Sequence, residues 1–423
     1  MNILINDILS ILPGGPETCS VYIIDGIIAS VSTAPDGFKA DKTISGVGKL
    51  LIPGLVNAHT HAAMTIFRNC ADDLLFNDWL FGRIIPMEEK LTGDDCYWGT
   101  MLAIMEMLRS GTTAFIDMYY FTDHCIRAIS ESGIRAAYSR GMQGDSAACA
   151  EEKLRSALEE YEKWKGLDKI SFMLAPHAPY TCDEGFQREV AAEAKRQGLP
   201  VTTHLSESLA EIETIRERYG CTPVELFDRT GLLTDTTIAA HCVHITDSDI
   251  ELLASRGVHV VTNPVSNLKL ANGVAPVPKL LKAGVKVALG TDGAASNNSL
   301  NMFRELSMLS LIHKGMTHDA QAISSHKGFL IASKNGADAM GMSDLGEIKP
   351  GSIADLVILS LDCPNMQPVN DPLAALAYSS TGSEVETVIV GGKVLMENRD
   401  FLTIDSDRVV FEIRKSCERI GTK

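Results

Sequence analysis

Residues 53–61 have the sequence PGLVNAHTH, an apolar run that ends in two histidines one residue apart. Such a run is typical of a buried β-strand, in which residues i and i+2 point to the same side. His59 and His61 are therefore expected to present both imidazoles together, as a pair suited to a cation such as Zn²⁺. Two hydrogen-bonded core histidines would give the same pattern, so this motif alone leaves metal binding open.

After this run, the sequence alternates between short strand-like segments and longer helical segments. Helical patterns are clear at residues 95–109, 151–165 and 187–197. The strand-like segments are residues 55–58, 112–118, 135–139, 170–175, 201–204, 237–241, 258–262 and 286–290. Eight strands separated by helices are typical of an α/β fold of the (β/α)₈ TIM-barrel type. Strand counting alone does not exclude a doubly wound parallel sheet.

Both ends of the chain are rich in short β-like segments. These segments are residues 19–24, 27–31 and 49–52 near the beginning and residues 355–359, 386–390 and 393–396 near the end. Asp25-Gly26, between the first two, is typical of a hairpin turn. We expect the two ends to pair into one small sheet domain beside the barrel.

Composition excludes several classes of function for this chain of 423 residues. Asp and Glu outnumber Lys and Arg by 54 to 38, so nucleic acids and anionic membranes are not expected as partners. The ten cysteines include no C-x-x-C pair, which excludes zinc-ribbon sites and favours free thiols. The N-terminus resembles no signal peptide, and no apolar run approaches the ~18 residues that span a bilayer. We therefore expect a cytoplasmic protein.

Residues capable of chemistry follow four further expected strands. His177, His204, His241 and Asp292 each stand where an apolar strand ends, and Glu207 follows His204 by three residues. Because the carboxyl ends of all strands meet at one mouth of a barrel, these side chains are expected to lie together there. Imidazoles and carboxylates in one place suit a metal centre with a proton-transferring acid beside it.

Longer motifs run in order through nearly the whole chain. They are PGLVNAHTH at 53–61, IIPMEEKLT at 84–92, YWGTMLAIMEMLRSGTT at 97–113, APHAPYTC at 175–182, THLSES at 203–208, AAHCVHI at 239–245, NPVSNLKLANGVAPV at 263–277 and LGTDGAASNNSLNMF at 289–303. With these motifs the chain resembles the amidohydrolase superfamily, in its branch of methylthioadenosine/S-adenosylhomocysteine deaminases. The resemblance implies a (β/α)₈ metal-dependent hydrolase barrel of residues 54–346 beside a composite β-sandwich of residues 1–53 and 347–423.

The resemblance also implies a set of site residues and one divalent metal, Zn²⁺ with Fe²⁺ as the alternative. The metal ligands would be His59, His61, His204 and Asp292. The catalytic residues would be Glu207 as proton shuttle, His241 as the group that orients water, and Asp292. The substrate-binding residues would be Glu88, His177, Arg140 and Trp79. Relatives with two metals bridge them with a modified lysine at the end of the fourth strand. Residues 170–180 contain no lysine, which agrees with a single metal. Without the resemblance, Glu88 fits a solvated helix start, Arg140 a surface arginine and Trp79 core packing.

One position departs from the family pattern. Lys153 stands where relatives that accept the homocysteine tail often place an arginine, and lysine lacks the forked geometry that suits a carboxylate. We therefore predict that methylthioadenosine or 5′-deoxyadenosine matches or exceeds S-adenosylhomocysteine as substrate. Arg140 is the other candidate partner of the carboxylate.

The implied activity is hydrolytic deamination of a 5′-substituted adenosine, namely methylthioadenosine, S-adenosylhomocysteine or 5′-deoxyadenosine. The partner is then a small-molecule nucleoside, and the sequence leaves open whether the chain forms a homo-oligomer. One alternative is hydrolysis of another ring, such as guanine, cytosine or an imidazolone, which would leave Glu88 without a ribose to bind. The other is a catalytically inactive scaffold protein, against which the filled metal and proton-transfer positions argue.

Overall fold

Nine short parallel strands surround the centre of the computed structural model, which describes residues 1–144 and 147–422. They are β6 (Leu55–Thr60), β7 (Thr112–Tyr119), β8 (Arg135–Met142), β9 (Ile170–Phe172), β10 (Ala175–Pro176), β11 (Val201–Leu205), β12 (Thr237–His241), β13 (His259–Thr262) and β14 (Lys286–Leu289). β9 and β10 together fill the place of the fourth expected strand. The predicted strand positions are therefore confirmed: β6, β7, β8 and β11 extend one to three residues further than the sequence indicates, and β13 and β14 are one residue shorter.

Two rows of these strands close into a barrel. At one junction Thr202 N donates to Leu174 O at 3.0 Å, and His204 N donates to His177 O at 2.9 Å. At the other junction Asp292 N donates to His59 O at 3.0 Å. Hydrogen bonds thus join the two rows at both junctions, which confirms the barrel and is not the arrangement of a doubly wound sheet.

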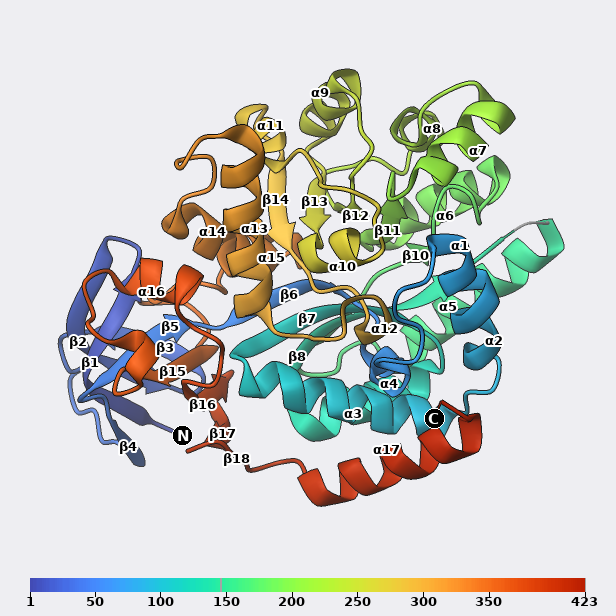
Figure 1. The fold of residues 1–423 in the computed structure, drawn as a ribbon. Helices are drawn as coiled ribbons and strands as arrows, with labels where there is room; N and C mark the ends of the chain where they lie inside the picture. Colours follow the sequence, from blue (N-terminus) through green and yellow to red (C-terminus); the bar gives the residue numbers. More distant parts are fainter. Residues whose placement is uncertain (145–146, 423) are drawn as a thin grey trace.

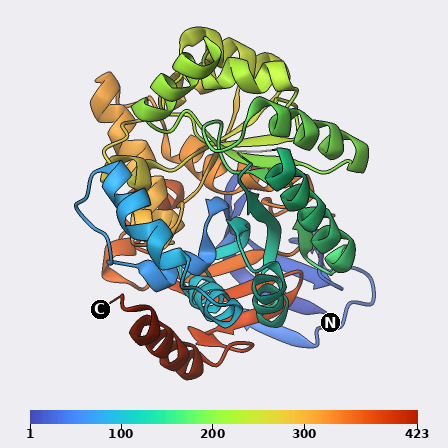
Figure 2. The ribbon, with the colours of Figure 1, turned by 90° about the vertical axis from the view of Figure 1, so that its right-hand side faces the viewer.

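Helices lie around the outside of the barrel and at its carboxyl mouth (Figures 1 and 2). They are α3 (Gly93–Arg109), α4 (Thr122–Ser132), α5 (Ala147–Trp164), α6 (Glu184–Gln197), α7 (Leu209–Tyr219), α8 (Pro223–Thr230), α9 (Asp247–Arg256), α10 (Pro264–Lys269), α11 (Val277–Lys282), α12 (Ala294–Asn297), α13 (Met302–Thr317), α14 (Ser325–Ala332) and α15 (Lys334–Ala339). Local capping sets their ends. For example, Thr92 and Asp95 form a capping box at the start of α3, which fixes two backbone N–H groups.

Strands from the two chain ends form one nine-stranded sheet, as predicted. The strands are β1 (Ile3–Leu12), β2 (Gly15–Ile24), β3 (Ile27–Val31), β4 (Lys42–Ser45), β5 (Lys49–Pro53), β15 (Leu356–Ser360), β16 (Val385–Val390), β17 (Lys393–Glu397) and β18 (Asp400–Phe401). β5 joins the two ends by pairing antiparallel with β15, and their side chains share one buried apolar cluster that includes Ile5, Leu51 and Leu356. The domain boundaries at residues 53/54 and 346/347 stay a prediction.

Two further segments complete the fold. A short helical segment of α1 (Phe76–Trp79), η2 (Leu80–Ile84) and α2 (Ile85–Glu88) precedes α3 and lines the barrel mouth. The terminal helix α17 (Ser406–Ile420) lies along α3, to which Arg419 is ion-paired through Asp95 (Figure 1). Among the described residues, no helix has both the length and the apolar character needed to cross a membrane.

Candidate metal and catalytic site

The residues expected at the strand ends converge on one cavity at the carboxyl end of the barrel. The lining includes His61, His177, His204, Glu207, His241 and Asp292 from the strand ends, and Trp79 and Glu88 from the segment between β6 and α3. His59 lies directly beneath, with 1% of its surface exposed. The structure thus brings together nine of the residues predicted for the site. Arg140 and Lys153 are not among the lining residues.

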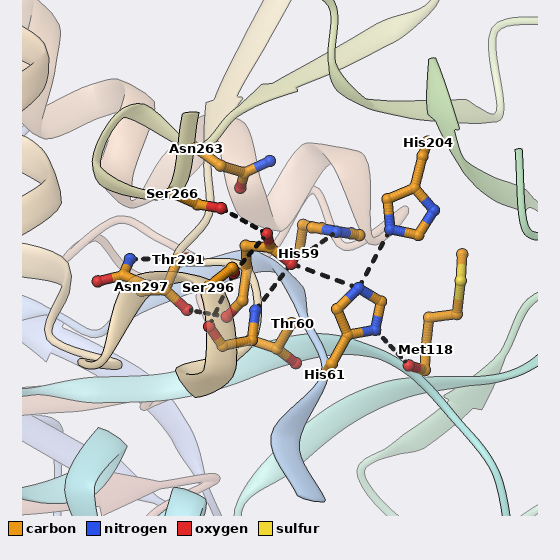
Figure 3. Close-up of polar contacts among 12 residues, drawn as sticks. His59, Thr60, His61, Met118, His204, Asn263, Ser266, Thr291, Ser296 and Asn297 are labelled. Carbon is orange, nitrogen blue, oxygen red and sulfur yellow. Dashed lines mark hydrogen bonds and ion pairs between the residues drawn. The ribbon is translucent and has the colours of Figure 1, made fainter. Parts of the chain in front are cut away.

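Two imidazoles are held so that their Nε2 atoms face each other. His61 Nδ1 lies 2.7 Å from Met118 O (Figure 3). His204 Nδ1 lies 2.7 Å from His177 O. A carbonyl oxygen only accepts, so both Nδ1 atoms carry a proton, and this orientation turns both Nε2 atoms towards the same point as possible ligands of a cation. These Nε2 atoms are 3.1 Å apart. Two acceptors at this distance repel each other unless a cation lies between them.

The other donor atoms complete a set that fits one metal ion. His61 Nε2 and His59 Nε2 lie 3.3 Å and 3.7 Å from Asp292 Oδ1. Atoms that each lie about 2.0–2.2 Å from one zinc ion must lie within about 4.4 Å of one another, and these spacings meet that limit. His59 Nε2 has no hydrogen-bond partner among the described residues, although it is buried. The donor set therefore fits a divalent metal. His59, His204 and His241 form a second group whose possible ligand atoms lie equally close to one another.

Asp292 is fixed by hydrogen bonds from α10, which follows β13, and from the segment that follows β14. Ser266 Oγ and Ser296 Oγ donate to Oδ2 at 2.6 Å and 2.7 Å, and Gly293 N donates to Oδ1 at 2.8 Å. Burial acts to raise the pKa of Asp292, but the neighbouring histidines and the Ser266 bond hold it well below its usual value. The backbone of Asp292 is also left-handed, with φ of 63°, which is uncommon for a residue other than glycine. Asp292 is thus held ionised towards the histidines.

His241 differs from the other imidazoles in its charge environment. Its Nδ1 lies 2.8 Å from Asn267 Oδ1, which leaves Nε2 facing Glu207 Oε2 at 4.0 Å. Burial acts to lower the pKa of His241, but the Glu207 and Asp292 carboxylates outweigh it and raise the pKa. For His204, burial and the adjacent His177 lower the pKa well below 6.5. His241 is therefore the imidazole of this group best suited to carry a second proton.

Glu207 is a buried carboxyl held at both its side chain and its backbone. Asn272 Nδ2 donates to Oε1 at 2.9 Å, and burial raises the pKa of Glu207. The carboxylate of Glu211 accepts from the backbone N–H groups of Ser206 and Glu207 at 2.8 Å and 2.9 Å. Ser206 has a φ of 52°, a backbone conformation that residues other than glycine rarely adopt, and this pair of hydrogen bonds stabilises the turn there. The result is a carboxyl with raised pKa aimed at His241.

Two substrate-binding candidates, Glu88 and Trp79, line the cavity from the segment that precedes α3. Tyr119 OH donates to Glu88 Oε1 at 2.9 Å, and burial raises the pKa of Glu88. Glu88 is therefore not the solvated helix residue that its local sequence would also fit. Trp79 is 6% exposed, and its indole Nε1 has no hydrogen-bond partner among the described residues. This wall can thus offer a carboxyl and a free donor to a polar ligand.

His177 and the two remaining basic residues occupy different surroundings. His177 lines the cavity with Nδ1 3.1 Å from Thr181 Oγ1, and burial lowers its pKa to about 3. Arg140 forms an ion pair with Glu160 of α5 at 2.5 Å. Lys153 lies on α5. The structure therefore does not bring Arg140 and Lys153 to the cavity wall.

Several supporting residues were not predicted from the sequence. They are Ser266, Asn267, Asn272, Ser296, Glu211 and Tyr119, which hold Asp292, His241, Glu207 and Glu88. The first four stand inside motifs 263–277 and 289–303, so the motifs pointed to these segments without assigning roles within them. Glu211 stands four residues after Glu207. At this spacing, a side chain in the first turn of a helix can accept hydrogen bonds from backbone N–H groups of the residues just before the helix.

Comparisons with known proteins agree with this geometry. The sequence pattern of the amidohydrolase family matches residues 50–395. A 5-methylthioadenosine/S-adenosylhomocysteine deaminase of Acetivibrio thermocellus is 45% identical over 94% of each chain, and one of Dictyoglomus thermophilum is 44% identical over 98% of this chain and 96% of its own. The crystal structure of an adenosine deaminase from Xanthomonas campestris with bound zinc superposes with a TM-score of 0.95 at 35% identity, covering 100% of this chain and 99% of that one.

Proposed function

The chain belongs to the amidohydrolase family, and from this premise we propose that it deaminates 5′-substituted adenosines by hydrolysis. The observation that carries the proposal is the placement of two separate carboxyls in one cavity. Glu207 lies beside His241 of the imidazole cluster, and Glu88 lines the same cavity from α2, where it accepts a hydrogen bond from Tyr119. The first suits proton transfer at a ring and the second suits the two hydroxyls of a ribose.

The proposed metal ligands are His59, His61, His204 and Asp292, because the proton on His241 Nε2 serves better as a donor. A divalent metal bound by these residues, zinc in our proposal, lowers the pKa of water so that a nucleophile exists at neutral pH. Neutral imidazoles are required for this role, and burial lowers the pKa of His59 and His204 well below 6.5.

The protein's own residues account for the proton transfers. Addition of water at C6 of the adenine ring requires a proton at N1, and the amine leaves only after it receives a proton. Glu207 has a raised pKa and a free oxygen, Oε2, so it can move the two protons of water one after the other. The first passes from the attacking water to N1, and the second passes from the hydroxyl formed at C6 to the amine, which leaves as ammonia. His241 can donate from Nε2 to the oxygen that becomes attached at C6. Asp292 can share the proton of the attacking water.

An ammonia-release assay tests the proposed function directly. We expect methylthioadenosine and 5′-deoxyadenosine to release stoichiometric ammonia with formation of the inosine analogue, and guanine and cytosine to release none. Turnover of a free base at a rate equal to that of the nucleosides would instead favour the alternative of another ring. Purified protein is expected to contain about one zinc per chain, and a chain without bound metal would favour the scaffold alternative.

Glu88→Gln is expected to lower kcat/KM for methylthioadenosine by about 10- to 100-fold, because a charged acceptor of a ribose hydroxyl contributes about 1.5–3 kcal/mol. The metal content should not change, since Glu88 is not part of the donor set. Glu89→Gln, an exposed neighbour, is the matched control and should behave as wild type. An unchanged kcat/KM for Glu88→Gln, measured by ammonia release, would show that Glu88 does not bind the ribose.

We also place the protein in the cytoplasm as a small-molecule enzyme. The nine cysteines whose side chains the structure describes are all free, which suits a reducing compartment. The formal net charge of −16 opposes binding to nucleic acid or anionic lipid.

A further inference from the structure

The outer part of the cavity offers no fixed cation to a substrate. Beyond the imidazole cluster, its wall is formed by aromatic and aliphatic side chains, among them Phe76, Leu80, Phe81, Tyr120 and Tyr180. No lysine or arginine occurs among the described lining residues, whereas three carboxyl side chains do. An anionic group on the 5′ tail of a nucleoside would therefore meet mainly apolar surface, with no lysine or arginine to pair with among the described lining residues.

Arg140 directly precedes a residue of the cavity wall in the sequence, but its side chain faces away from the cavity. It lies on β8 one residue before Gly141, which lines the cavity, and neighbouring residues of a strand point to opposite faces. Its Nη1 donates to Glu160 Oε1 at 2.5 Å, and Thr122 Oγ1 donates to Glu160 Oε2 at 2.6 Å. The Arg140 and Glu160 side chains are 32% and 23% exposed. Both carboxylate oxygens of Glu160 are thus occupied, and a partner for Arg140 is already in place.

We propose that Glu160 is a specificity-determining residue that neutralises Arg140 and so directs the site towards nucleosides with a neutral 5′ substituent. The Arg140 guanidinium keeps further N–H donors besides Nη1, but its charge is already shared with Glu160, so a carboxylate tail that reached it would lie beside the Glu160 carboxylate. Repulsion between the two carboxylates then offsets most of the attraction to Arg140, and little net affinity results. A 5′-deoxy or methylthio group brings no such charge and contacts the apolar wall. This inference rests on the proposed function, because it assumes that the cavity takes a 5′-substituted adenosine.

The test compares kcat/KM for four nucleosides: methylthioadenosine, 5′-deoxyadenosine, S-adenosylhomocysteine and its decarboxylated analogue, which keeps the ammonium group. In the wild type, S-adenosylhomocysteine should be about tenfold or more below the methylthio compound, and the analogue without carboxylate should recover much of this loss. Glu160→Gln should raise the value for S-adenosylhomocysteine about tenfold, with less than a twofold change for methylthioadenosine. Glu159→Gln, on the same helix and paired with Arg155 instead, is the matched control and should change neither.

Arg140→Gln keeps the test decisive even if Glu160→Gln folds poorly. Because Arg140 is already paired, its loss in the wild type should leave the ratio of the two substrates within twofold. A tenfold loss of S-adenosylhomocysteine turnover in Arg140→Gln, or in a variant of Arg218, the exposed arginine of the adjoining groove, would overturn the proposal. An unchanged ratio in well-folded Glu160→Gln would also overturn it. Turnover of methylthioadenosine in the same variants tests the proposed deaminase function separately. A failure of that function can therefore be distinguished from a failure of the role proposed for Glu160.

Discussion

Glu207→Gln is expected to lower kcat for methylthioadenosine by about 10²- to 10⁴-fold, the usual contribution of a general acid–base group. The amide can still accept the hydrogen bond that Asn272 Nδ2 donates to Glu207 Oε1 at 2.9 Å, so the side chain should keep its place. What it loses is the ability to take a proton from water and release it to the ring and the amine. KM should change much less than kcat, because the lost interaction belongs to the transition state.

The metal content of Glu207→Gln should equal that of the wild type. Glu207 Oε2 lies 4.0 Å from His241 Nε2 and is outside both groups of donor atoms that could hold an ion. The matched control is Glu213→Gln, an exposed position on helix α7, which begins two residues after Glu207, and this variant should retain full activity. Measurement of kcat by ammonia release and of zinc by elemental analysis decides the matter. A kcat within tenfold of the wild-type value would remove Glu207 from the proton transfers.

The barrel could be predicted from the sequence because its signals are local. Each barrel strand is a short apolar run bounded by helix signals, and such runs predict strands without knowledge of their neighbours. β1 was not predicted as a strand because its alternation is interrupted: Asp7 has a φ of 52°, and the register with β2 shifts between Ile5 and Ile8. A bulge of this kind moves side chains to the other face, which hides the period of two.

The candidate site divides in the same way. His61, His204 and Asp292 could be placed at one mouth from strand ends alone, because parallel barrel strands share their polarity. The fate of Arg140 depends on a tertiary contact, since only the packing of α5 against β8 brings Glu160 within 2.5 Å of it. From the sequence, an arginine at the end of a barrel strand is expected to bind substrate. In the folded protein Arg140 is instead paired with Glu160.

His59→Ala is expected to remove most of the bound metal and to lower kcat/KM by more than about 10²-fold. The removed imidazole is 1% exposed and belongs to both groups of potential ligand atoms, so no other described side chain duplicates its position. Its Nε2 has no hydrogen-bond partner among the described residues, so the variant loses a donor to the metal and leaves no protein group newly unpaired there. The effect should therefore reach the metal content as well as activity.

A thermal measurement separates loss of metal from general damage. A metal at 100 times its dissociation constant adds about 2.7 kcal/mol to the free energy of unfolding, so chelation should lower the Tm of the wild type and zinc should restore it. His59→Ala should unfold near the chelated wild type and gain little from added zinc. The matched control is His259→Ala, since His259 is also buried but begins β13 and so lies at the opposite end of the barrel. That variant should lose some stability yet keep its metal and its response to zinc, whereas full zinc occupancy in His59→Ala would show that the metal is held by other residues.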